Sequence, residues 1–288
     1  MMARVLGVSR AGYYVWKKRH HTPVAASSPS GRRLAISARV TELFTTKHKG
    51  FAGARTIFAD LVAEGIETTL YAVRTIMAQN NLVTKYRRKK VRTTIADPNA
   101  ELRKDYLRRM FYPPVPTTVL CGDITYLRTR EGWMYLAIVM DLGTRMVVGW
   151  SMADSMHSKL VVDALTMAHD RGFVAGDAIF HSDRGSQYTS KVFADCAEEL
   201  DVRLSVGSVG VCWDNAVAES FFSTLKLHLL HERKQFDSKQ HARLETLSWI
   251  ETYYNRQRRH SATGLIPAEA MADFLTPSPE LLPEALAA

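Results

Sequence analysis

Between residues 117 and 206, strand-forming runs alternate with runs of helical periodicity, and this alternation constrains the fold more than any other feature. Runs rich in β-branched and aromatic residues predict strands at Thr118–Leu127, Trp133–Asp141 and Met146–Trp150. Short connections join these three strands, which predicts an antiparallel meander. Further on, two amphipathic helices alternate with two short strands, at Lys159 to about His169, Ala178–His181, Ser190–Leu200 and Arg203–Val206. This order predicts an α/β fold in which helices flank a sheet.

Basic residues concentrate in the first part of the chain. Residues 1–110 contain 22 Lys and Arg against 7 Asp and Glu, a balance of +15. The remaining residues contain 16 against 22, a balance of −6, and the two balances sum to the net charge of +9. An excess of positive charge at one end is typical of a region that binds a polyanion, most often nucleic acid.

Composition divides the chain into four stretches. Residues 1–95 are helical and basic, as expected of a DNA-binding region, and residues 96–116 contain helix-breaking prolines, as expected of a linker. Residues 117–275 contain the alternating strands and helices, and residues 276–288 form a tail without periodicity. No apolar run is long enough for a transmembrane helix, and no signal peptide is evident. The three cysteines are far apart, which favours a reduced cytoplasm and disfavours a cysteine-based zinc site.

The basic stretch contains a candidate helix-turn-helix at about residues 51–82. A first helix is expected over Ala54–Glu64, ended by Gly65, and a second from Thr69 to about Gln79, with Thr68 as its N-cap. In a helix-turn-helix the second helix enters the major groove, so Arg74 is a candidate DNA contact. Any helical hairpin gives a similar pattern, and the shorter run at residues 6–14 resembles a fragment of such a motif.

A basic run at residues 85–92 follows this hairpin, with six basic residues in eight positions. It is either a DNA contact or a solvated charged face, and its position directly after a helix-turn-helix favours DNA. The candidate contacts in the run are Lys85, Arg87, Arg88, Lys89 and Lys90.

Three acidic residues occupy positions where a carboxylate has a chemical use. Asp123 lies inside the first predicted strand, where burial is costly unless the group is paired or binds a metal. Asp183 directly follows a buried strand, and open α/β sheets bind ligands at such strand ends. Glu219 lies on a predicted helix, and Lys226 projects from nearly the same face two turns later. Taken singly, each acid is weak evidence, because most surface carboxylates are only solvated.

Three carboxylates together suit Mg²⁺ or Mn²⁺, which prefer hard oxygen ligands. Two such ions about 3.5–4 Å apart can activate an attacking oxygen and stabilise a leaving oxygen in phosphoryl transfer. By contrast, Asp141, Asp177 and Asp214 stand at turns or caps, where a structural role is expected. His181 and His260 are expected to form hydrogen bonds or phosphate contacts rather than to bind metal.

Several motifs in order resemble the second-reading-frame transposases of the insertion-sequence-three family, which carry the DDE signature of retroviral integrases. The spacing is similar, with 35 residues between Asp183 and Glu219 and a lysine seven positions after Glu219. The motifs are Asp123-Ile124-Thr125-Tyr126, His181-Ser182-Asp183-Arg184-Gly185-Ser186-Gln187-Tyr188, Cys212-Trp213-Asp214-Asn215-Ala216, Glu219-Ser220-Phe221-Phe222-Ser223-Thr224-Leu225-Lys226 and Tyr254-Asn255-Arg256-Gln257-Arg258-Arg259-His260-Ser261. The resemblance extends from the first residues to about Ala270.

This resemblance implies a ribonuclease H-like integrase core, with a mixed sheet flanked by helices, preceded in the chain by a helical DNA-binding region. It implies that Asp123, Asp183 and Glu219 are the catalytic residues and hold two Mg²⁺ or Mn²⁺ ions. The substrates would be DNA element ends and target DNA, with Lys226, Arg184 and Arg258 as further DNA contacts. It also implies a homo-multimer on DNA, no membrane, and a location at the bacterial nucleoid in the cytoplasm.

Two departures from the family pattern bear on activity. The segment at residues 206–211 lacks the basic residue that usually precedes the motif beginning at Cys212. In this family a first reading frame also supplies a DNA-binding and multimerising segment, as a separate protein or through a frameshift fusion. Two alternatives stay open: a ribonuclease H-like nuclease or resolvase that cuts without joining, and a DNA-binding regulator with a decayed core. For residues 249–260, a predicted helix, the alternatives are internal packing and help in gripping DNA.

Overall fold

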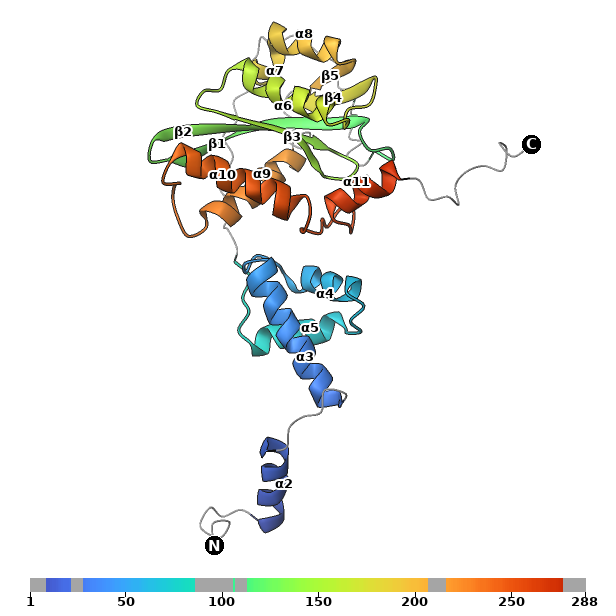
Figure 1. Cartoon of the computed structure of the whole chain (residues 1–288), viewed down its shortest axis with the longest axis vertical. Coiled ribbons are helices and arrows are strands. Elements are labelled where there is room, and N and C mark those ends of the chain that lie inside the picture. Colours follow the sequence, from blue (N-terminus) through green and yellow to red (C-terminus); the bar gives the residue numbers. More distant parts are fainter. Residues whose placement is uncertain (1–8, 22–27, 86–105, 107–112, 207–215, 277–288) are drawn as a thin grey trace, which may run out of the picture. The chain divides into compact units, whose positions relative to one another are not determined.

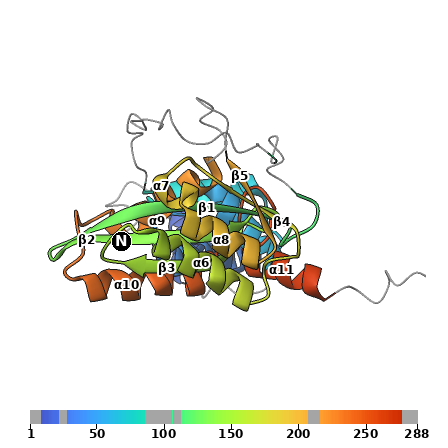
Figure 2. The same ribbon diagram turned by 90° about the horizontal axis from the view of Figure 1, so that it is seen from above.

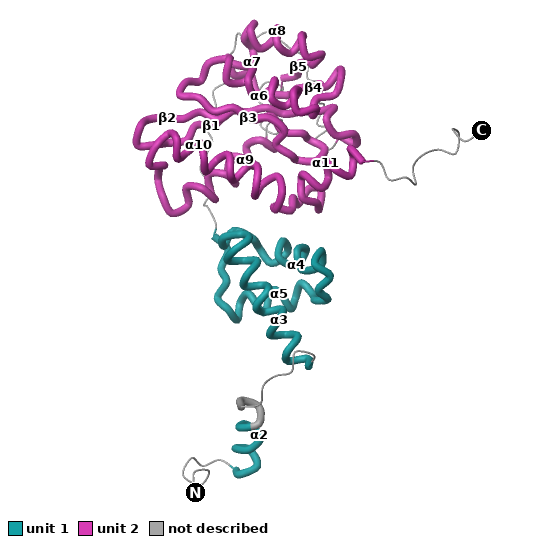
Figure 3. Tube along the Cα trace, in the orientation of Figure 1, with its two compact units in different colours: residues 1–85 teal, residues 86–288 magenta. Residues whose placement is uncertain are grey.

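The computed structural model describes residues 9–21, 28–85, 106, 113–206 and 216–276 of the 288-residue chain. It divides the chain into two compact units, residues 1–85 and residues 86–288 (Figure 3). The basic run at residues 85–92, except Lys85, lies outside the described residues, and so does most of the predicted linker at residues 96–116. So do the motif at residues 212–215 and the tail from residue 277.

The first unit is helical. Its elements are α2 (Arg10–His21), α3 (Pro29–Glu42), the π-helix η1 (Leu43–Lys47), α4 (Ala54–Ala63) and α5 (Leu70–Gln79). Val40, Leu43, Ile57, Leu61 and Val73 are fully or almost fully buried at the centre of this unit. These side chains come from α3, η1, α4 and α5, so the predicted helical pair shares one hydrophobic core with α3 and η1.

The predicted helical pair forms, with one correction at its turn. Gly65 ends the first helix with φ +72, a left-handed conformation that glycine adopts without steric cost. The N-cap of α5 is Thr69, whose hydroxyl accepts a hydrogen bond from Ala72 N at 3.1 Å. The prediction of Thr68 as the cap was therefore wrong by one residue, because both threonines satisfy the capping preference and only the backbone path selects one.

The second unit is built on a five-stranded mixed sheet with the strand order β3-β2-β1-β4-β5. The strands are β1 (Val119–Thr129), β2 (Gly132–Asp141), β3 (Val147–Ala153), β4 (Ala178–Ser182) and β5 (Val202–Val206). The first three strands pair antiparallel, as predicted, and β4 and β5 add in parallel on the other side of β1. The paired β1 and β2 extend past β4, which pairs with β1 only at residues 119–121 (Figure 1, Figure 2).

Helices cover both faces of this sheet (Figure 1). The helices of one face are α6 (Ser158–Asp170), α7 (Ser186–Thr189) and α8 (Lys191–Glu199). The other face is covered by α9 (Ala216–Leu230), α10 (Lys239–Ser248) and the π-helix η2 (Trp249–Tyr254). A last helix, α11 (Pro267–Leu275), ends the described chain. The predicted α/β class, a mixed sheet flanked by helices, is confirmed.

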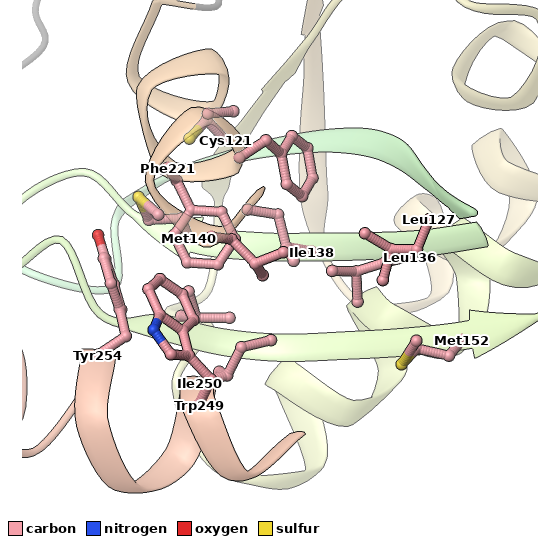
Figure 4. Close-up of a cluster of buried hydrophobic side chains, with 14 of the residues drawn as sticks. Cys121, Leu127, Leu136, Ile138, Met140, Met152, Phe221, Trp249, Ile250 and Tyr254 are labelled. Atoms are coloured by element: carbon pink, nitrogen blue, oxygen red, sulfur yellow. The ribbon is translucent and has the colours of Figure 1, made fainter. Parts of the chain in front are cut away.

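Alternation along the strands separates two hydrophobic cores. On β2, Leu136, Ile138 and Met140 face the α9 side, whereas Ala137 and Val139 face the α6 side. Figure 4 shows the first of these cores, in which side chains of β1 and β2 meet Phe221, Trp249 and Tyr254. Because successive strand residues point to opposite faces, a one-residue slip in register would exchange the two cores.

The helix predicted at residues 249–260 is shorter than expected. Its π-helical part ends at Tyr254, and a turn follows from Asn255, which keeps helical backbone angles while its side chain is buried. Asn255 donates from Nδ2 to Val147 O and accepts from Val147 N at Oδ1, each at 3.0 Å. This pair of hydrogen bonds satisfies the backbone of β3, and helical periodicity in the sequence gives no sign of it.

Candidate active site

Asp183 directly follows β4, and Asp123 lies within β1 at the level where the adjacent parallel strand β4 ends. The register between β1 and β4 runs from Val119 opposite Ile179 to Cys121 opposite His181. Asp123 lies two residues after Cys121, and Asp183 lies two residues after His181. Because neighbouring strands lie about 4.8 Å apart, this register brings two residues that are far apart in sequence into one neighbourhood.

Local hydrogen bonds orient both carboxylates, which are partly buried. Asp183 Oδ1 accepts from Gly185 N at 2.9 Å, which closes a tight turn directly after β4. Asp123 Oδ1 accepts from Ile124 N at 2.8 Å. Each of these bonds uses one carboxylate oxygen and fixes the side chain against its own backbone.

Tyr188 is a buried neighbour of both aspartates that the sequence analysis did not single out. Its pKa is raised well above the usual value, first by burial and then by the negative charges of Asp123 and Asp183. Its ring packs against Phe180 and Phe193 in the core on the α6 side. The only signal in the sequence was its position five residues after Asp183. The structure thus places a low-polarity wall beside the two acids.

Glu219 lies in the first turn of α9 and is exposed. Ala218, Phe221 and Leu225 are buried along α9, and this helix packs against β1. Two turns after Glu219, the Lys226 Nζ atom lies 4.7 Å from the centre of the Tyr126 ring on β1. As predicted from helical spacing, the glutamate and the lysine lie beside the buried stripe rather than in it.

The structure brings together two of the three predicted acids. Among the residues it describes, no group of three or more His, Cys, Asp or Glu side chains lies close enough to hold a metal ion. Asp123 and Asp183 supply carboxylate oxygens, the donor type that Mg²⁺ and Mn²⁺ prefer. The segment that leads into α9, residues 207–215, lies outside the described residues.

Comparison with known proteins decides the family. Residues 113–212 and 200–267 match families described as integrase core domain, and residues 32–90 match an HTH-like domain. The chain is 36% identical over 268 residues to transposase InsF for insertion sequence IS3A of Escherichia coli (strain K12), covering 93% of this chain and 91% of the relative. The chain belongs to the insertion-sequence-three family of transposases. The transposase is also 34% identical over 272 residues to the insertion element IS600 uncharacterized 31 kDa protein of Shigella sonnei, covering 94% and 97%.

Two solved structures are similar to parts of the transposase. A chain of the cryo-EM structure of the simian T-cell lymphotropic virus intasome with PP2A regulatory subunit B56 gamma has a TM-score of 0.48 at 14% identity, covering 85% of this chain and 76% of that one. The HTLV-2 integrase catalytic core domain in complex with magnesium has a TM-score of 0.42 at 15% identity, covering 55% and 97%. The integrase core match and the mixed sheet together confirm the predicted ribonuclease H-like class with an HTH-like region before it.

Residues predicted to contact DNA are distributed over both units of the transposase. In the first unit, Arg74 is exposed on α5, and Lys85 Nζ lies 5.2 Å from the centre of the Phe51 ring. In the second unit, Arg184 is partly buried after Asp183, and the Arg258 guanidinium lies 5.6 Å from the centre of the Tyr254 ring. The other predicted contacts, Arg87, Arg88, Lys89 and Lys90, lie outside the described residues.

The structure gives the surroundings of three other polar residues of the second unit that the sequence singled out. Asp141 is fully buried and accepts hydrogen bonds from Thr117 N and from Thr144 N and Oγ1, each at 2.7 Å. His181 is buried and shares a 3.0 Å hydrogen bond between Nδ1 and Ser205 Oγ. Burial, followed by the charges of Arg258 and Arg145, lowers the pKa of His260 to about 4. No helix in the described part of the transposase is long and apolar enough to span a membrane.

Proposed function

We propose that this transposase cuts DNA at the ends of an insertion element and joins the freed ends to new DNA. In the proposed reaction a water cuts one strand, and the resulting 3′-hydroxyl then attacks another phosphodiester. Each step forms one phosphorus–oxygen bond and breaks another, and no covalent protein–DNA intermediate is needed. Asp123, Asp183 and Glu219 are the proposed catalytic residues.

One observation carries this assignment of residues. Asp123 and Asp183 each lie two residues after the pair Cys121 and His181, which are opposite each other on the parallel strands β1 and β4. The negative charges of both aspartates raise the pKa of the buried Tyr188. Two carboxylates placed together beside a low-polarity wall repel each other and are stabilised by a divalent cation. This arrangement supports a role in metal binding rather than a purely structural role.

We propose that the three acids hold two Mg²⁺ or Mn²⁺ ions. When bound, such ions activate the attacking oxygen and stabilise the leaving oxygen of a phosphoryl transfer. Asp123 and Asp183 supply the donors that are already together. Glu219 is the third donor, and its exposed position in the first turn of α9 leaves it able to join the two aspartates when DNA is bound.

The remaining residues of the proposal position DNA. Lys226, Arg184 and Arg258 would contact phosphates near the acids, and Arg74 would project from the second helix of the HTH-like region into the major groove. The basic run from Lys85 to Lys90 would add sequence-independent contacts. We further propose that the transposase acts as a homo-multimer at the nucleoid, in the bacterial cytoplasm, with a first-reading-frame protein or as a frameshift fusion.

Asp183→Asn tests the proposed function in an assay with end-labelled oligonucleotides that resolves cut from joined products. With Mg²⁺, the wild-type chain should give both products, and Asp123→Asn, Asp183→Asn and Glu219→Gln should each lose both by at least about 100-fold while DNA binding is retained. Asp195→Asn is the matched control, since Asp195 forms only an exposed pair with Lys191 on α8.

The outcomes separate this proposal from its alternatives. Cut but unjoined products from the wild-type chain would indicate a nuclease or resolvase. Binding without any cutting, unchanged in Asp183→Asn, would indicate a regulator with a decayed core. A parallel loss of binding and cutting in all three acid variants would show that these acids maintain the fold.

A further inference from the structure

An exposed pair of aromatic side chains lies on the paired strands β1 and β2, downstream of Asp123. Tyr126 is 57% exposed and Trp133 is 47% exposed, and their ring centres lie 5.1 Å apart with an interplanar angle of 84°. We call this pair the Tyr126–Trp133 platform. Single exposed rings are ordinary on a protein surface, but two rings in edge-to-face contact form one apolar surface that a base can contact.

Positive charge borders the platform. Lys226 of α9 places its Nζ atom 4.7 Å from the centre of the Tyr126 ring. Arg128, also exposed, is the register partner of Trp133 across the two strands. The one acid in the neighbouring turn, Glu131, accepts a hydrogen bond from Lys239 N at 2.8 Å and so caps the start of α10. Aromatic rings combined with cations are typical of surfaces that bind unpaired nucleotides.

Among the described residues, no strand covers the edge of β1 beside Tyr126. Strand β4 pairs with β1 only as far as Cys121, and an isolated bridge joins Thr129 to Phe236. Between these two contacts the described strands include no partner for that edge of β1. The extended part of β1 and β2 is visible in Figures 1 and 2. A nucleotide could therefore reach the ring without displacing a strand.

Tyr126 lies on the same strand as Asp123, and Lys226 lies on the same helix as Glu219. Tyr126 lies three residues after Asp123 on β1, which is about 10 Å along an extended strand. Lys226 lies seven residues after Glu219 on α9, which is also about 10 Å along a helix. These are distances between backbone positions, because residues three apart on a strand point to opposite faces of the sheet, Asp123 toward the α9 side and Tyr126 toward the α6 side.

We propose that the Tyr126–Trp133 platform stacks an unpaired base of the DNA end, while Lys226 neutralises an adjacent phosphate. This proposal deepens the proposed function, because it assigns a position to part of the same DNA substrate. Stacking on aromatic rings tolerates any base, so the platform favours an unpaired end over a paired one regardless of sequence.

Binding without divalent metal tests the platform separately from catalysis. The probes are a blunt duplex carrying an element end and the same duplex with three unpaired terminal nucleotides, one of which is 2-aminopurine. The wild-type chain should bind the unpaired end more tightly and quench the 2-aminopurine. Trp133→Ala and Tyr126→Ala should weaken binding of the unpaired end by about 5- to 150-fold, change blunt-end binding less than about twofold, and abolish the quenching.

Two further variants control the experiment. Phe274→Ala removes an exposed aromatic ring, 41% exposed on α11, and should leave both binding and quenching unchanged. Tyr126→Phe keeps the ring and should retain the quenching, which a role confined to the hydroxyl would not. The proposal would be wrong if the two alanine variants lost equal affinity for both probes. It would also be wrong if the wild-type chain bound both probes with the same affinity. Intact quenching in a chain that neither cuts nor joins would overturn only the proposed function.

Discussion

Phe180 on β4 packs directly over Gly122, the residue before Asp123 on β1. A Cβ atom on Gly122 would lie 2.2 Å from Cζ of Phe180, far inside van der Waals contact. The Phe180 ring is held from its other sides by Tyr188 and Phe193, so it cannot easily move away. Glycine at position 122 therefore allows β1 and β4 to approach where the two aspartates meet.

Gly122→Ala should therefore destabilise the second unit by about 1–3 kcal/mol, because overpacking forces Phe180 from its position. Chemical denaturation monitored by circular dichroism would measure this change. Gly53→Ala, where a Cβ atom meets nothing within 4 Å, lies in the first unit and should leave the stability of the second unit unchanged. Combining Gly122→Ala with Phe180→Ala should recover part of the loss attributed to the clash, and strictly additive effects would contradict direct contact.

Asn255→Ala should destabilise the second unit by about 2–5 kcal/mol. Asn255 is 1% exposed, and its removal leaves the buried N–H and C=O groups of Val147 without these hydrogen bonds. The free energy of unfolding from urea titration would measure the loss. Gln257→Ala, at an exposed position two residues on, should change it by less than about 0.5 kcal/mol. A stable Asn255→Ala protein that has lost only DNA binding would instead assign Asn255 to the DNA interface.

His260 should make the second unit less stable as the pH falls from about 6.5 to about 4. Burial and the charges of Arg258 and Arg145 lower its pKa to about 4, so the folded chain keeps this side chain neutral while the unfolded chain takes up a proton. The unfolded state then binds more protons, which costs up to about 3 kcal/mol of stability by pH 4. His260→Gln should flatten the pH dependence of the unfolding free energy in this range. If the unfolding free energy had the same pH dependence in both proteins, groups other than His260 would cause the loss of stability.

Neutralising Arg87, Arg88, Lys89 and Lys90 to Gln should weaken DNA binding and lower its salt dependence. Each lost phosphate contact removes about one unit from the slope of log affinity against log salt concentration. Fluorescence anisotropy at several salt concentrations would give this slope. As the control, Lys159→Gln and Lys191→Gln remove lysines that form exposed pairs within α6 and α8. An unchanged slope in the fourfold variant would exclude the run from the interface.

Much of the fold could be predicted because local patterns report it directly. The five strands were predicted to within three residues at each end, since β-branched runs and turn residues mark them. The helix expected to reach His260 ends at Tyr254, and the side-chain hydrogen bonds of Asn255 to β3 are not encoded in any local pattern. The cap at Thr69 was missed because Thr68 and Thr69 both satisfy the capping preference and only the backbone path selects one of them.

The sequence by itself determined the order of the elements, the charge of each stretch and the spacing of the three acids. Only the tertiary structure decided that β4 pairs with β1, with the register that places Asp183 beside Asp123 and Tyr188 near both. Periodicity records which face of a strand is buried, but it does not record which strand lies next to it. Strand pairing is fixed by the packing of both cores at once, through contacts between residues about 60 positions apart in the chain.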